Sequence, residues 1–409
     1  MSYFPSWPQF DIQSIKDVTD ILISGKVNYW TGNKGKEFEQ NFSQWVGVRY
    51  AISCSSGTSA LHTAINSLGI GPGDEVIVPS YTFIATSFAV LQSGAIPIFC
   101  DVSLDHTIDP NKIKALITSK TKAIIVVHLY GVVCDMDSII KIAKQCDLKV
   151  IEDAAQCLGG MYKGKKVGTI GDVGAFSFCQ SKHFTTGGEG GMIVTNDENL
   201  SWECKSFRDH GFDVKKRIGL IELEEQSFHV HNKIGFNFRM TEVQSAIGIN
   251  ELNRFDDWNL LKRKRFANIY DSAFIDMEEI LSIPFNSDER ENAYWLYPLT
   301  INRSQFKKGD ASFIISELKK LNIPAFKIQW PEAYIEKVYR ELKGFGSANF
   351  PFQSKEYTSP ESVDYKNVLC EVSHSLLPIT FSLYLHPTWE DEHIYQCIKG
   401  LKQVLKNIT

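Results

Sequence analysis

Between residues 50 and 200, short runs of apolar residues alternate with stretches of helical periodicity. Continuous runs rich in Val and Ile are typical of strands buried on both faces, and such strands belong to parallel sheets that helices cover. The pattern predicts an α/β fold with a mostly parallel sheet, in which ligands bind at the carboxyl ends of the strands. The expected strands lie at residues 50–54, 75–79, 97–102, 123–131, 149–155, 174–178 and 191–195.

The character of the sequence changes after about residue 255, which indicates a second domain. A chain of 409 residues is long enough for two domains. We predict a large domain over residues 1–255 and a smaller C-terminal α+β domain over 256–409, with the N-terminal segment packing on the small domain. The small domain is expected to contain a charged helix at roughly 251–275, the segment YWLYPLTI at 294–301, and helices at 310–321 and 389–405.

The stretch 344–367 is rich in Gly, Pro, Ser and aromatic residues. A segment of this length without a regular pattern is either a functional loop or a mobile segment. The sequence leaves both possibilities open.

The composition narrows the class of protein. The net charge is −5 with both signs spread along the chain, which argues against a nucleic-acid or membrane partner. The nine cysteines form no CxxC pair, so no metal site is expected and the thiols fit buried, reduced residues of a cytosolic enzyme. Because we find neither a signal-peptide pattern nor an apolar run of membrane-spanning length, we expect a cytoplasmic protein.

The segment SSGTSAL (55–61) follows one expected strand and opens a helix. Gly57 allows close approach of the backbone, and the first amides of a helix point outward at its positive end. This arrangement suits a phosphate group. On its own the signal is weak, because many α/β turns contain Ser and Gly for their geometry alone.

The segment VIEDAAQ (150–156) ends a buried strand with two acidic residues. A buried carboxylate must be paired, or it takes up a proton. Asp153 could therefore pair with a protonated heterocycle nitrogen, and Gln156 could lie on the same face if the turn is helical. The alternative is a structural acid that caps the next helix.

The segment FSFCQSKHFTTGGEGGM (176–192) places Lys182 between an apolar run and a run of small residues. A phosphate site, a buried aspartate and this lysine together match the needs of pyridoxal phosphate: an anchor for its phosphate, an anion opposite its ring nitrogen and an amine for its aldehyde. PSYTFIATS (79–87) adds Tyr81 and Phe83, either of which could stack on the ring. The same segment contains Glu189. For this residue a structural role in the turn is at least as good an interpretation as a role at the cofactor.

The chain resembles the DegT/StrS-type sugar aminotransferases, which have the fold type I of aspartate aminotransferase. This resemblance implies a large domain with a mostly parallel sheet flanked by helices, and a smaller C-terminal domain. The motifs on which the resemblance rests are SGKVNYWTG (24–32), SSGTSAL, GPGDEVIVPSYTFIATS (71–87), VIEDAAQ, GDVGAFSF (171–178), the lysine segment and GFNFRMTEVQSAIG (235–248).

The resemblance implies a role for each matching residue. Lys182 would hold the pyridoxal phosphate covalently and, as a free amine, would move a proton between the substrate and the cofactor. Asp153 would keep the pyridine nitrogen protonated. Gln156 would donate a hydrogen bond near the 3-oxygen of the ring, and Phe83 would stack on the ring.

The resemblance also implies a phosphate site and a dimer. The amides of Gly57 and Thr58, with the hydroxyl of Ser177, would bind the phosphate. Asn237 would reach the phosphate in the neighbouring subunit's site, so the active sites of a homodimer would be shared.

The expected reaction moves an amino group from an amino acid, with L-glutamate the expected donor, to a keto sugar. In this family such sugars are usually nucleotide-linked and enter surface polysaccharides or glycosylated metabolites. The chain has TTGGEGG (185–191) where family members usually have TTGEGG, and the extra glycine leaves the acceptor open. The GEGG ending favours amination at the fourth carbon of the sugar.

Three alternatives remain at this stage. The segments WPQF (7–10) and FCQSK (178–182) slightly favour a cyclitol or a small phosphorylated ketone as the acceptor. A pyridoxamine-dependent sugar dehydratase is disfavoured, because such relatives have histidine at the position of Lys182. A non-catalytic regulator is disfavoured by the full set of cofactor residues.

Overall fold

The computed structural model describes residues 3–223, 230–306, 309–328, 330–357 and 364–408. Its centre is a seven-stranded sheet with the order β1-β9-β8-β5-β4-β2-β3. All neighbouring strands are parallel except those that pair with β9, which runs antiparallel to both β1 and β8. The strands are β1 (Tyr50–Cys54), β2 (Glu75–Pro79), β3 (Ile96–Cys100), β4 (Thr121–Val127), β5 (Lys149–Asp153), β8 (Val173–Ser177) and β9 (Gly191–Thr195).

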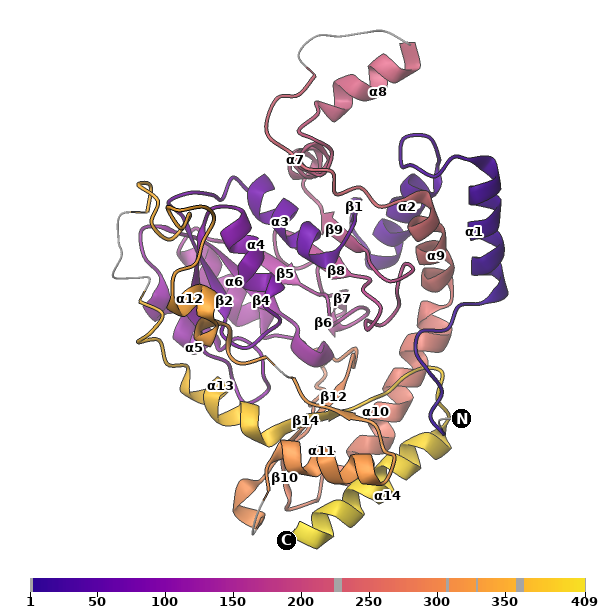
Figure 1. Ribbon diagram of the computed structural model, residues 1–409, viewed down its shortest axis with the longest axis vertical. Helices are drawn as coiled ribbons and strands as arrows, with labels where there is room; N and C mark the ends of the chain where they lie inside the picture. Colours follow the sequence, from indigo (N-terminus) through magenta and orange to yellow (C-terminus); the bar gives the residue numbers. More distant parts are fainter. Residues whose placement is uncertain (1–2, 224–229, 307–308, 329, 358–363, 409) are drawn as a thin grey trace.

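Both faces of this sheet are buried, as the apolar runs predict. In β2, Val76 and Val78 belong to one apolar core, whereas Ile77 between them belongs to another. Side chains alternate between the two faces of a strand, so both faces need a covering layer. One face is covered by α3 (Gly57–Ser67), α4 (Ala85–Gln92) and α7 (Glu198–Arg208), and the other by α2 (Lys34–Val46), α6 (Met136–Gln145) and α9 (Glu242–Asn253) (Figure 1).

Local sequence explains why α3 begins where it does. Ser56 has extended backbone angles, and its hydroxyl accepts a hydrogen bond of 3.1 Å from the amide of Ser59. The hydroxyl of Ser59 in turn accepts a hydrogen bond of 2.9 Å from the amide of Ser56. This reciprocal cap satisfies two donors at the start of the helix and fixes the turn after β1.

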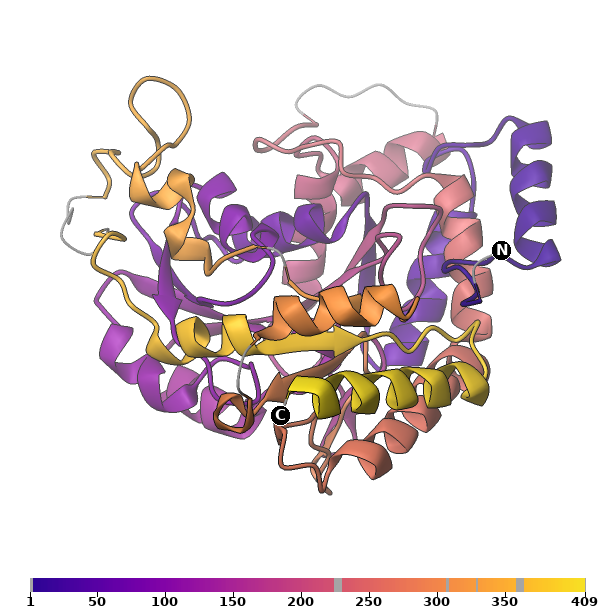
Figure 2. The ribbon, with the colours of Figure 1, turned by 60° about the horizontal axis from the view of Figure 1, so that its bottom comes forward.

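The C-terminal part contains a second sheet, with the order β10-β12-β14-β13 and antiparallel pairing throughout. Three helices pack on this second sheet, and together the sheet and the helices form a separate apolar core (Figure 2). The strands are β10 (Ile280–Ser282), β12 (Tyr297–Ile301), β13 (Ala325–Phe326) and β14 (Thr380–Leu383), and the helices are α10 (Leu261–Phe274), α11 (Ala311–Lys320) and α14 (Asp391–Ile408).

The charged helix expected at roughly 251–275 is divided. α9 ends at Asn253, a π-helical segment η3 (Phe255–Leu260) follows, and α10 continues from Leu261. The predicted boundary at residues 255 and 256 falls at the start of this π-helical segment and stays a prediction.

The buried apolar residues that the structure describes between Ile328 and Leu376 belong to the apolar core on one face of the large sheet. Tyr357 donates a hydrogen bond of 2.7 Å to Glu75 at the start of β2, and Tyr365 donates one of 2.8 Å to the carbonyl of Pro97 in β3. The described parts of the 344–367 stretch are thus attached to β2 and β3 of the large sheet. Residues 358–363 lie outside the described residues. Two short helices, α12 (Lys337–Arg340) and α13 (Glu371–Leu376), belong to this region.

The N-terminal segment lies against the beginning of α14 (Figure 1). The indole of Trp389 donates a hydrogen bond of 3.0 Å to the carbonyl of Pro5, and its ring lies 4.8 Å from that of Phe4. After this contact the chain continues into α1 (Ile12–Ser24), which packs beside α9.

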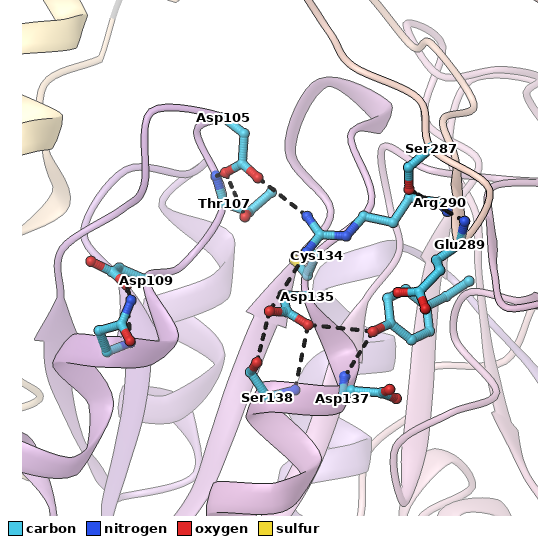
Figure 3. A network of polar contacts seen from close by, with 12 residues as sticks. Asp105, Thr107, Asp109, Cys134, Asp135, Asp137, Ser138, Ser287, Glu289 and Arg290 are labelled. Atoms are coloured by element: carbon cyan, nitrogen blue, oxygen red, sulfur yellow. Dashed lines mark hydrogen bonds and ion pairs between the residues drawn. The ribbon is translucent and has the colours of Figure 1, made fainter.

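A polar network joins the segment before β12 to the loops of the large sheet (Figure 3). Arg290 lies 3.5 Å from Asp105 and 3.6 Å from Asp135, the residue that caps α6. Three short strands meet nearby, in the order β11-β6-β7. They are β6 (Met161–Tyr162), β7 (Lys165–Lys166) and β11 (Arg290–Glu291). Two further α-helices of the described chain are α5 (Pro110–Ile113) and α8 (Val214–Leu223).

Three further findings concern the cysteines, metal binding and membrane-spanning helices. All nine cysteines are free, and seven of them are buried. The described ranges contain no group of three or more His, Cys, Asp or Glu side chains that could hold a metal ion. Within the same ranges, every helix is too short or too polar to cross a membrane.

Candidate active site

A cavity of about 590 Å³ opens beside the carboxyl ends of β5 and β8. Seven of the eight site residues predicted from the sequence line it, although they come from five separate segments of the chain. The structure therefore brings together the phosphate, ring and lysine motifs. These lining residues are Gly57, Thr58, Phe83, Asp153, Gln156, Ser177 and Lys182.

The start of α3 forms one end of this cavity. Within the described chain, the amides of Gly57 and Thr58 have no hydrogen-bond acceptor. A Cβ atom added to Gly57 would lie 2.7 Å from Cβ of Ser177 and 3.0 Å from its hydroxyl. Because only glycine allows this approach, two free amides and one hydroxyl lie together at a helix N-terminus, which fits a phosphate group.

Asp153 is the last residue of β5 and is only 5% exposed. Its carboxylate accepts hydrogen bonds from Thr86 Oγ1 at 2.8 Å and from the amide of Ala155 at 3.2 Å. No Lys or Arg in the described ranges forms an ion pair with it. Burial raises the pKa of Asp153, while these two hydrogen bonds and the charge of Lys182 act in the opposite direction.

This environment distinguishes between the two interpretations of Asp153. No helix lies between β5 and the next strand, β6 (Met161–Tyr162), so Asp153 does not cap one. A buried carboxylate without a cation gains most from a protonated nitrogen, which supplies both the positive charge and a hydrogen-bond donor. The residues present therefore fit a pyridinium ring.

Gln156 is oriented by the backbone. Its Oε1 accepts a hydrogen bond of 2.8 Å from the amide of Tyr130. The NH₂ group at the other end of the side chain is therefore available as a donor at the cavity, which Gln156 lines.

Lys182 lies in the loop between β8 and β9. Its Nζ is 4.2 Å from the centre of the Trp295 ring and makes no hydrogen bond or ion pair in the described part of the protein. Burial lowers the pKa of Lys182 to about 8, although the charge of Asp153 opposes this change. A substantial fraction of the amine is thus neutral near pH 8, which makes it a nucleophile.

Glu189 also lines the cavity, and its backbone belongs to a well-connected turn. Its carbonyl accepts hydrogen bonds from Thr186 Oγ1 at 2.6 Å and from Gln244 Nε2 at 2.7 Å. These contacts agree with a structural role for the turn. Tyr81 is buried and does not line the cavity, and its hydroxyl is 2.5 Å from that of Tyr130.

Sequence reasoning missed a second group of residues that line the cavity, which we call the aromatic wall. Its members come from the N-terminal segment and from the region around the small sheet. Single aromatic residues in separate segments have no periodicity that would connect them, so only the folded chain identifies them. The aromatic wall consists of Trp7, Trp295, Phe326, Trp330, Tyr384 and His386.

The aromatic wall has internal order. The rings of Trp7 and His386 are stacked at 6.0 Å with an interplanar angle of 12°. The ring of Trp330 contacts that of Phe83 edge to face, with the two ring centres 5.2 Å apart. Flat apolar surfaces of this kind suit a substrate with planar rings or sugar faces.

Asn237 is the one predicted site residue that does not line the cavity. It is exposed and forms an isolated bridge with Asp209. The next residue, Phe238, accepts a hydrogen bond of 2.8 Å from the amide of Ser55, just before α3. The predicted contact of Asn237 with a neighbouring subunit stays a prediction.

The DegT/DnrJ/EryC1/StrS aminotransferase family matches this chain over residues 8–402. The chain belongs to that family. The resemblance predicted from the sequence is therefore confirmed, and the protein is an aminotransferase.

Individual relatives agree with this assignment. The chain is 39% identical over 316 residues to a GDP-perosamine synthase of Caulobacter vibrioides, which covers 76% of this chain and 81% of the relative. It is also similar to a solved aminotransferase of Psychrobacter cryohalolentis, with 36% identity, 99% of each chain covered and a TM-score of 0.87. This structural likeness confirms the predicted fold type I.

A third relative bears on the cofactor. The solved NtdA protein of Bacillus subtilis, described with bound cofactor PMP, is 28% identical, with 99% of this chain and 86% of that chain covered and a TM-score of 0.81. The expected cofactor, pyridoxal or pyridoxamine phosphate, is thus confirmed as a cofactor of solved members of this family.

Proposed function

We propose that this aminotransferase transfers the amino group of L-glutamate to a nucleotide-linked keto sugar, for the biosynthesis of amino sugars or surface polysaccharide. The observation that supports this most strongly is the meeting of three groups at one cavity: the free amides after β1, the buried carboxylate of Asp153 and the amine of Lys182. Each group matches one part of pyridoxal phosphate.

When bound, pyridoxal phosphate supplies an electron sink for the charge that develops on the substrate carbon. Asp153 would hold the proton of the ring nitrogen, which keeps that sink effective. Gln156 would donate from Nε2 to the ring oxygen, and Phe83 would cover one face of the ring. Lys182 would bind the cofactor through Nζ and, once free, would take the proton from the carbon that bears the amino group.

The phosphate would occupy the start of α3. The amides of Gly57 and Thr58 and the hydroxyl of Ser177 would donate hydrogen bonds to it. The positive end of the helix would stabilise a phosphate held by these donors.

The aromatic wall and a relative named GDP-perosamine synthase support a nucleotide-linked sugar as the acceptor. We propose that the enzyme is a cytoplasmic homodimer and that Asn237 completes the partner's phosphate site. Asn237 is exposed and does not line the cavity of its own subunit, which is consistent with this arrangement.

The test has two stages. Purified protein is reduced with borohydride in the presence of pyridoxal phosphate, and peptide mapping should find the label on Lys182. The enzyme is then incubated with L-glutamate and a panel of GDP-, UDP- and dTDP-linked keto sugars, and products are identified by mass spectrometry. Label on another lysine would overturn the site, whereas amination of cyclitol ketones in preference to every nucleotide sugar would overturn the acceptor class.

A further inference from the structure

The backbone of the lysine loop is held by side chains. The carbonyls of residues 181–183 are consecutive, and each accepts a hydrogen bond from a different side chain. Trp295 Nε1 donates to the first at 2.6 Å. Trp7 Nε1 donates to the second, that of Lys182 itself, at 3.1 Å. Asn259 Nδ2 donates to the third at 2.5 Å.

These bonds compensate for the missing secondary structure of the loop. Residues 181–183 belong to no helix or strand, and within the described chain their carbonyls accept no hydrogen bond from the backbone. Buried carbonyls without partners are costly. The three donors come from the N-terminal segment, from η3 and from the segment before β12, so the position of Lys182 depends on distant parts of the chain.

A buried arginine orients two of these donor segments. Arg263 Nε donates to Asn259 Oδ1 at 2.8 Å, which turns the amide of Asn259 so that Nδ2 points to the loop. Arg263 Nη1 donates to the carbonyls of Tyr294 and Trp295, each at 3.1 Å. Arg263 is fully buried and forms no ion pair in the described ranges, and this burial lowers its pKa to about 9.

Trp295 makes a second contact with the lysine. Its ring centre lies 4.2 Å from Lys182 Nζ, while its indole nitrogen binds the preceding carbonyl. One side chain thus contacts both the amine of Lys182 and the backbone carbonyl of Ser181, the residue before it. An aromatic face at this distance attracts an ammonium group without forming a bond that would have to break before Nζ reacts.

We propose that Trp295 is a positioning residue that fixes Nζ of Lys182 relative to the cofactor ring, with Trp7 and Asn259 holding the following two carbonyls. This inference rests on the proposed function, because it requires Lys182 to be the cofactor lysine. A misplacement of about 1 Å in an active site can lower the rate about 10²-fold, so the indole contacts have a direct effect on turnover.

The experiment compares three variants of the full-length enzyme loaded with pyridoxal phosphate. Trp295→Phe keeps the aromatic ring and removes the N–H donor, whereas Trp295→Leu removes both. Trp45→Phe is the matched control, because Trp45 Nε1 also donates a hydrogen bond, to Asp256 at 2.8 Å, but does not line the cavity. The measurements are kcat, KM for L-glutamate, Tm, and the visible circular dichroism per bound cofactor, which reports how firmly the ring is oriented.

For Trp295→Phe we expect kcat to fall roughly tenfold with KM for L-glutamate within about twofold of wild type, and for Trp295→Leu we expect a fall of about 10²-fold. The visible circular dichroism should decrease in the same order, and Trp45→Phe should retain the wild-type kcat and dichroism. Wild-type kcat and dichroism in both Trp295 variants would overturn the inference, as would equal losses in Trp45→Phe. Failure of wild-type protein to attach the cofactor at Lys182 would instead refute the proposed function.

Discussion

Thr86 Oγ1 donates a hydrogen bond of 2.8 Å to Asp153 Oδ2, so a residue of α4 supports the carboxylate at the end of β5. This contact keeps one carboxylate oxygen occupied and leaves the group oriented at the cavity. Burial raises the pKa of Asp153, and the hydrogen bond from Thr86 acts in the opposite direction.

Asp153→Asn should reduce catalysis more than cofactor binding. Asparagine is nearly isosteric, but it no longer favours a protonated ring nitrogen, and the charge on the ring develops mainly in the transition state. We expect kcat to fall by roughly 10²-fold or more. Single-turnover reaction with L-glutamate, followed by absorbance, measures this step, and a cofactor-saturated mutant that reacts at the wild-type rate would remove Asp153 from the mechanism.

Lys182 should react with pyridoxal phosphate in a pH-dependent manner. Burial lowers the pKa of this amine from 10.5 to about 8, and only the neutral amine attacks an aldehyde. The rate of attachment to the apoprotein should therefore rise with pH up to about 8 and level off above it. Asp153→Asn removes a negative charge that raises the pKa of Lys182, so the break should move to lower pH. A rate that keeps rising to pH 10 would contradict the buried position of the amine.

Gly57→Ala should weaken cofactor binding through Ser177. The added methyl group would lie 2.7 Å from Cβ of Ser177, so the hydroxyl has to move away from the phosphate. We expect the Kd for pyridoxal phosphate to rise by about tenfold or more, since a hydrogen bond to a charged group contributes roughly 1.5–3 kcal/mol.

The double variant tests this explanation. In a Ser177→Gly background the methyl group at position 57 has more room, so Gly57→Ala should cost less than it does alone. Coupling of about 1 kcal/mol or more in the cycle, measured by titration of cofactor absorbance, would support a direct contact. Additive effects would mean that the two residues act independently.

Asn237 should complement a defect in the opposite subunit. Mixed Lys182→Ala and Asn237→Ala chains form heterodimers in which one site has both defects and the other has neither, so part of the activity should return. Subunit exchange is checked by native mass spectrometry with two tags of different mass. If exchange is complete and activity does not return, Asn237 does not serve the partner's site.

The sequence alone determined the order of the large-sheet elements along the chain and the set of candidate cofactor residues. Val and Ile runs are local features, and burial on both faces is their simplest physical consequence, so β1, β2 and β9 have the predicted bounds. The other strands of the large sheet overlap the predicted runs, but β4 ends at Val127 and not at residue 131, because Leu129–Gly131 form a 3-10 turn. The phosphate turn could also be predicted, because Ser56, Gly57 and Ser59 act through their immediate neighbours.

Tertiary structure decided the reversed direction of β9, the break between α9 and α10, and the aromatic wall. The donors to the carbonyls of residues 181–183 are Trp7, Asn259 and Trp295, and no local pattern records which distant carbonyl such a side chain will meet. The perturbed pKa values of Asp153 and Lys182 arise in the same way. Both depend chiefly on burial, which is a property of the packed chain and not of the residues along it.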